Sequence, residues 1–128
     1  MTRNTAREIA MHLAYELSFN DLPVEEFLTR QLSAEAYIRR LVSGVAEHAA
    51  ELDGDIEKYA RGWRFERISL VASAIMRVAM YEMLYMADIP AGVAINEAVE
   101  IAKSYESPEV VKFINGILGS FARGELKD

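Results

Sequence analysis

The chain has 128 residues, 52% of them hydrophobic and only three of them proline, so it is long enough to bury the core of one compact domain. It contains no cysteine, which excludes a disulfide framework and a thiolate metal site. The net charge of −6, from 14 basic and 20 acidic residues, argues against broad non-specific affinity for nucleic acid, so any contact with nucleic acid must be local.

From these bounds we expect a single domain over residues 1–128, without a resident metal or cofactor. His12 and His48 stand alone, with no metal-ligand spacing around either. No basic segment followed by an apolar run opens the chain, which favours a cytoplasmic location.

Helical patterning dominates the first half of the chain, and no alternation typical of strands persists. Thr5 is a candidate N-cap for the first helix and Ser33 for a longer, later one, because their hydroxyls can accept a hydrogen bond from a free backbone N–H of the first turn. The expected helices cover about residues 6–17, 24–31 and 34–52, and the expected interruptions lie at 20–23, 53–55 and 61–63.

The segment from Leu70 to Ala87 is apolar almost all round, and its only strongly polar members are Ser73, Arg77 and Glu82. A helix of this kind is typical of the buried centre of a bundle. Its length also suits a membrane span, but an arginine and a glutamate near the middle are costly in lipid, so we reject that alternative.

Glu82 shares a stripe with apolar residues and needs a hydrogen-bond donor. Arg77 lies about 140° round the same helix and is poorly placed to be that donor. Two alternatives remain open from the residues alone. In one, each charge pairs with a residue on a neighbouring helix; in the other, this end of the helix emerges at a protein interface, where Glu82 meets a basic partner.

Two amphipathic helices follow, one after Pro90 and one announced by Ser-Pro-Glu at 107–109, where a serine cap, a proline and an acid favour initiation. On the second helix, Phe113 falls about 90° from the centre of the apolar stripe, and Lys112 and Gly116 lie farther round. Together they form a candidate platform for stacking a base or touching a phosphate. Alternatively, Phe113 is an edge-of-core residue and Gly116 lets a neighbouring helix pack tightly.

The stretch from Ala94 to Leu118 also carries a family resemblance. It contains Asn-Glu-Ala-Val-Glu-Ile-Ala-Lys at 96–103 and Lys-Phe-Ile-Asn-Gly-Ile-Leu at 112–118. Both segments closely resemble the C-terminal part of the NusB family of bacterial transcription antitermination factors. Met76 to Glu82 and the spaced residues Arg7, Ala10 and Tyr15 are similar to two further segments of that family. The resemblance runs over nearly the whole chain, although the middle third contributes little.

The resemblance implies an all-α fold of about seven helices in two packed helical subdomains. It also implies a transcription antitermination factor that binds the boxA element of ribosomal RNA leaders as single-stranded RNA. The implied partners are NusE, which is a small-subunit ribosomal protein, and the transcription elongation complex.

Matching the family motifs residue by residue identifies candidate sites. Many relatives carry a dense basic cluster near the N-terminus, but only Arg3 and Arg7 remain there in this chain. The candidate RNA-binding residues are therefore Arg7, Tyr15, Lys112 and Phe113, with Arg3 added as a guess, and the candidate partner-binding residues are Arg77, Tyr81 and Glu82.

The chain shows no catalytic constellation, since it has no phosphate-binding glycine loop, no Cys/His pair and no serine with a base nearby in sequence. We therefore expect neither an enzyme nor catalytic residues, and no membrane contact. The favoured hypothesis is an RNA-binding antitermination factor that works as a heterodimer with NusE. The competing hypothesis is a helical protein-binding adaptor without direct RNA recognition, one form of which is a homodimer.

Overall fold

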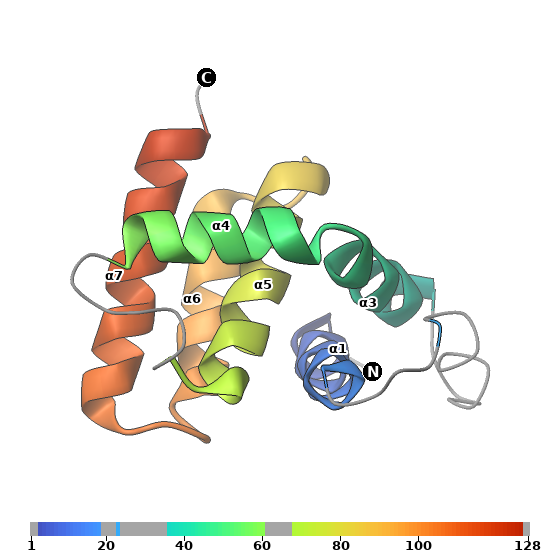
Figure 1. The fold of residues 1–128 in the computed structure, drawn as a ribbon, viewed down its shortest axis with the longest axis horizontal. Helices are drawn as coiled ribbons and strands as arrows, with labels where there is room; N and C mark the ends of the chain where they lie inside the picture. The colour runs from blue at the N-terminus through green and yellow to red at the C-terminus, as the bar shows by residue number, and fades with distance from the viewer. Residues whose placement is uncertain (1–2, 19–22, 24–35, 61–67, 127–128) are drawn as a thin grey trace.

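The computed structural model describes residues 3–18, 23, 36–60 and 68–126, and within these ranges it contains α-helices and no strand (Figure 1). This confirms the all-α prediction, and the six helices of the described ranges are close to the expected number. The expected helix over 24–31 and the expected interruption at 61–63 lie outside the described residues. The helices are α1 (Arg3–Leu17), α3 (Ala36–Glu47), α4 (Ala49–Tyr59), α5 (Leu70–Tyr85), α6 (Ala91–Ala102) and α7 (Pro108–Glu125).

Helix α5 is the centre of the molecule, as its all-round apolar sequence predicts. It packs against α1, α3, α4, α6 and α7. Met76, Val78 and Met80 on this helix are each 0% exposed. In Figure 1, α1 and α3 lie together on one side of α5, α6 and α7 lie on the other, and α4 runs across the front. The two helical subdomains therefore meet along α5.

The beginnings of α6 and α7 agree with their sequence signals. Helix α6 begins directly after Pro90, and α7 begins with Pro108. The hydroxyl oxygen of Ser107 accepts a hydrogen bond from the backbone N–H of Val110 at 3.3 Å. Such caps satisfy backbone donors that the first turn leaves free.

Two expected boundaries are wrong. The break after α3 lies at His48, and residues 53–55 are inside α4. Leu52 and Ile56 are each 0% exposed and lie one turn apart on the buried face of α4, so their burial outweighs the cost of about 1 kcal/mol for a mid-helix glycine. Helix α1 begins at Arg3, so Thr5 lies inside it and is not its cap.

None of the described helices combines the length and apolar character that crossing a membrane requires.

A glycine in α3 lets α3 and α5 approach closely. A Cβ atom placed on Gly44 would lie 2.1 Å from Cζ of Tyr81 on α5 and 2.5 Å from its hydroxyl oxygen. The Tyr81 side chain cannot easily move away, because the residue is only 8% exposed and its ring lies between α3 and the rings of His48 and Tyr85. The contact between α3 and α5 thus depends on the absence of a side chain at residue 44.

We expect Gly44→Ala to lower the free energy of unfolding by about 1–3 kcal/mol, because overpacking outweighs the better helix propensity of alanine. Gly54→Ala on α4 is the matched control, since a Cβ there meets no described atom within 4 Å. It should leave stability unchanged or raise it by up to about 1 kcal/mol. Urea unfolding followed by circular dichroism compares the two variants, and equal stability of both would contradict the packing argument.

Candidate functional site

The polar centre of the molecule is a buried ion pair between α1 and α5. The Arg7 guanidinium donates from Nε to Oε1 of Glu82 at 2.7 Å and from Nη2 to Oε2 at 2.8 Å. Tyr37 of α3 donates its hydroxyl to the same Oε2. Arg7 is 1% exposed and Glu82 is 0% exposed. The carboxylate is tolerated at this depth because three donors satisfy it and the guanidinium binds it in bidentate geometry.

This pairing corrects the interpretation of both residues. Arg7 is predicted to hold an RNA phosphate and Glu82 to meet a protein partner, but the structure buries both side chains and joins them to each other. Of the two alternatives for Glu82, the structure shows the one in which the charge pairs with a neighbouring helix. In this conformation neither side chain is accessible to RNA or to a partner.

The other two residues predicted for partner contact also bind neighbouring helices. Arg77 donates from Nε and Nη2 to the two carboxylate oxygens of Asp53 at 2.6 and 2.8 Å, which joins α5 to α4. Tyr81 covers Gly44 on α3. Both side chains are mostly buried, so Arg77 and Tyr81 hold the end of α5 in place rather than present it.

Tyr85 is the exposed aromatic residue at this end of α5, with 38% of its surface accessible. Its ring stacks on His48 with 4.4 Å between centroids and lies 5.1 Å from the ring of Tyr81. Its hydroxyl donates to Glu51 at 2.7 Å, and this hydrogen bond raises the pKa of Tyr85 to about 12. Sequence reasoning missed this cluster, although Tyr81 is one of the expected partner residues and Tyr85 lies one helical turn beyond it.

The two surface candidates on α1 lie near opposite ends of that helix. Arg3 is exposed, approaches Asp88 at 3.9 Å, and stands over the ring of Tyr37 at 5.0 Å. Tyr15 is half-buried and borders a small hollow shared with His12 and Tyr105. Since a helix rises 1.5 Å per residue, about 18 Å separates the two candidates along α1.

The polar edge of that hollow joins α1 to the turn between α6 and α7. The hydroxyl of Tyr105 donates to Oε2 of Glu8 at 2.5 Å, and Nε2 of His12 lies 2.7 Å from the same hydroxyl. The hydrogen bond to Glu8 raises the pKa of Tyr105 above its ordinary value. His12 is therefore part of a hydrogen-bonded cluster.

On α7, the structure separates the surroundings of Lys112 and Phe113. Lys112 is exposed and borders a groove between α6 and α7, whereas Phe113 is half-buried, packs on the core edge and borders a hollow beside Ser69 and Glu109. A Cβ on Gly116 would meet no described atom within 4 Å, so the tight-packing interpretation of this glycine is wrong for the part of the chain that the structure describes.

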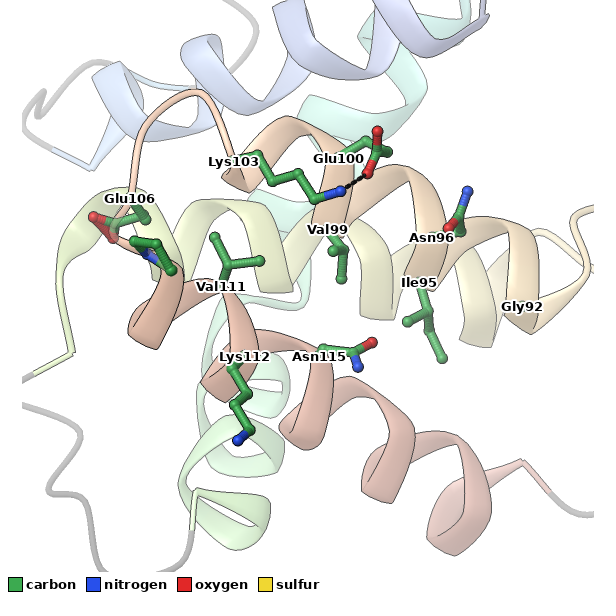
Figure 2. Close-up of a pocket in the computed structure, with 11 residues that line it drawn as sticks. Gly92, Ile95, Asn96, Val99, Glu100, Lys103, Glu106, Val111, Lys112 and Asn115 are labelled. Atoms are coloured by element: carbon green, nitrogen blue, oxygen red, sulfur yellow. Dashed lines mark hydrogen bonds and ion pairs between the residues drawn. The ribbon is translucent and has the colours of Figure 1, made fainter.

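The groove between α6 and α7 has a volume of about 790 Å³. Figure 2 shows Ile95 and Val99 directed from α6 toward the gap and Val111 directed back from α7, while Lys112 projects from the outer side of α7. Asn96 and Asn115 border the groove from the two helices. Helical periodicity alone did not reveal this groove, because it depends on how α6 and α7 cross.

The comparisons with known proteins agree with this architecture of an all-α protein with two packed helical subdomains. A family model described as the NusB family matches residues 4–123. The transcription antitermination protein NusB of Acetivibrio thermocellus is 45% identical and covers 98% of this chain and 92% of its own length. The chain therefore belongs to the NusB family.

Two solved structures show the same fold. T. maritima NusB has a TM-score of 0.87 and 30% identity, and the match covers 99% of this chain and 94% of that one. A structure of the antitermination factors NusB and NusE in complex with double-stranded RNA has a TM-score of 0.78 and 22% identity, and the match covers 94% of this chain and 96% of that one.

Breaking the buried pair should be costly. We expect Glu82→Gln to lower the free energy of unfolding by about 3–5 kcal/mol, because it leaves the Arg7 charge buried without a counter-ion. Glu100→Gln is the matched control on the surface, since Glu100 pairs with Lys103 in solvent and should change stability by less than about 1 kcal/mol. The double change of Arg7 and Glu82 to methionine should lose less than Glu82→Gln does. Urea unfolding of the variants measures these differences, and a neutral Glu82→Gln would contradict a structural role.

Tyr37 should make stability fall at alkaline pH. Burial and its hydrogen bond to Glu82 raise the pKa of Tyr37 well above its ordinary value. Above about pH 10 the unfolded chain therefore loses this proton before the folded chain does, and the free energy of unfolding falls as pH rises. Tyr37→Phe removes this titration, so its stability should decline less steeply between pH 9 and pH 11. Identical slopes for both proteins would show that Tyr37 ionises as it does in water.

Proposed function

We propose that this chain is a transcription antitermination factor that binds single-stranded boxA-type RNA of ribosomal RNA leaders together with NusE, within the transcription elongation complex. The observation that carries the proposal is membership of the NusB family over residues 4–123, with 45% identity to a relative named as a transcription antitermination protein. The structure of NusB with NusE and RNA supports the choice of partners, although at 22% identity its likeness to this chain concerns the fold alone.

The proposed RNA surface consists of Lys112 and Phe113 on α7 with Arg3 and Tyr15 on α1. All four are exposed or half-buried, and Lys112 and Phe113 match the family motif. An aromatic ring can stack on an unpaired base while a lysine binds the adjacent phosphate. Arg7 does not contact RNA in this proposal. Its buried pair with Glu82 holds in place α1, the helix that carries Arg3 and Tyr15.

The proposed contact with NusE lies at the end of α5. Tyr85 and His48 form the accessible part of this surface, and Arg77, Tyr81 and Glu82 support it from beneath. Tyr85 and His48 lie close to Glu51 and Asp55, so a basic surface on the partner would complement them. A basic partner would also offset the net charge of −6 that opposes RNA binding.

One observation favours the competing function of a protein-binding adaptor. Two arginines of this acidic chain, Arg7 and Arg77, are engaged in internal ion pairs. That leaves fewer cations for phosphate contacts, so a protein-only role, as a heterodimer or a homodimer, is the alternative that the RNA measurements must separate from the proposal.

We expect Phe113→Ala to cost roughly 1–3 kcal/mol in RNA binding by the complex with NusE, because it removes the stacking ring. Phe113→Leu keeps most of the packing against the core and should cost nearly as much if stacking is the cause. Lys112→Ala should cost less and flatten the salt dependence, since one phosphate contact is lost. The measurement is a titration of labelled boxA RNA at two salt concentrations, with and without NusE.

Lys58→Ala on α4 is the control for loss of a surface lysine. A duplex of the same sequence is the control for preference for single strands, and thermal unfolding checks each fold. If the wild-type complex binds no boxA RNA, or if the Phe113 and Lys112 variants bind it unchanged with intact folds, the adaptor function replaces this proposal.

A further inference from the structure

The groove between α6 and α7 has the chemistry of a ligand site. Its volume of about 790 Å³ falls within the range of roughly 300–1,000 Å³ that small-molecule sites span. Its floor is apolar, because Ile95, Val99 and Val111 are half-buried and point into the gap (Figure 2). A planar, partly apolar group could rest on such a floor.

Two lysines, Lys103 and Lys112, and two carboxylates, Glu100 and Glu106, border the groove, so their charges balance. Lys103 donates to Glu100 at 2.5 Å, and Glu106 accepts a hydrogen bond from the Ser69 hydroxyl at 2.8 Å. Lys112 forms no ion pair with any residue in the described ranges, and it stands at the outer edge of the groove. Lys112 is therefore available to contact one phosphate at the outer edge, while the lining as a whole carries no net charge.

The two asparagines supply the remaining chemistry. Asn96 and Asn115 are exposed, and neither makes a side-chain hydrogen bond within the described ranges. A carboxamide carries both a donor and an acceptor, which matches the mixed edge of a nucleobase. An apolar helix of a protein partner would cover these amides without satisfying them, which is costly.

We infer that the groove between α6 and α7 receives one unpaired base of the bound RNA, whose backbone passes Lys112. The base lies against Val99 and Val111, and the Asn115 amide hydrogen-bonds its edge. This inference rests on the proposed function, because it places a base-specific subsite beside the Lys112 and Phe113 surface. It adds sequence recognition to a surface that phosphate contacts alone would leave unspecific.

An abasic scan tests whether a base occupies the groove. Each position of the boxA RNA is replaced in turn by an abasic nucleotide, and affinity for the NusE complex is measured with wild type and with Asn115→Ala. In wild type, one position should lose affinity on base removal. In Asn115→Ala, intact RNA should bind about 3- to 10-fold more weakly, as loss of one hydrogen bond predicts, and removal of that same base should cost correspondingly less.

A pair of glycine variants tests the space itself. Gly92 borders the groove on α6 and Gly54 lies on α4, and a Cβ at either position meets no described atom within 4 Å. Gly92→Leu should narrow the groove at the Gly92 end and weaken RNA binding, whereas Gly54→Leu should leave the affinity unchanged. Thermal unfolding and NusE binding are measured for both variants.

The outcomes separate this inference from the proposed function. If Phe113→Ala weakens RNA binding while Asn115→Ala and Gly92→Leu do not, the RNA function stands and the base subsite is wrong. If both groove variants weaken NusE binding and leave RNA affinity per complex unchanged, the groove binds protein, which overturns the inference. If Asn115→Ala weakens binding equally for every abasic RNA, no base lies in the groove, and the inference is likewise wrong.

Discussion

The arrangement of the two helical subdomains depends on one ion pair, between Arg7 of α1 and Glu82 of α5. These residues are 75 positions apart in the chain, and both lie in the core. Burying two charges costs several kcal/mol per ion before their attraction offsets it, so such a pair adds little net stability compared with apolar residues. The pair does destabilise other arrangements, because a shift of α1 along α5 would leave both charges buried without a partner. Tyr37 extends the same constraint to α3.

The ion pair between Arg77 of α5 and Asp53 of α4 constrains the position of α5 in the same way. Arg77 and Glu82 are the charged residues of this helix, and each binds a different neighbour: Asp53 on α4 and Arg7 on α1. An apolar helix that contacts five others could rotate or slide among similar packings. Two directional pairs, about 140° apart on the helix, select one rotation and one register. The surface residues of α1 and α4 therefore have fixed positions relative to α7.

Local signals in the sequence were enough to predict the all-α class, the central helix and the starts of α6 and α7, because periodicity and caps act within a few residues. The family motif located Lys112 and Phe113 on an accessible helix. The same approach failed for Gly54, where the burial of Leu52 and Ile56 overrides a local break. It also failed for Arg7, because the need of Glu82 for a donor was evident from the sequence but the identity of the donor depends on tertiary packing.

The internal ion pairs of two arginines limit how this chain can bind RNA under the proposed function. With 20 acidic and 14 basic residues, and with Arg7 and Arg77 paired internally, fewer basic side chains remain to release counterions from phosphates. Under the proposed function, recognition then relies on contacts that do not depend on charge, such as stacking on Phe113 and hydrogen bonds to base edges. These contacts discriminate between sequences, whereas phosphate contacts do not. In the proposed complex, a basic partner would therefore add affinity, and this chain would supply the sequence preference.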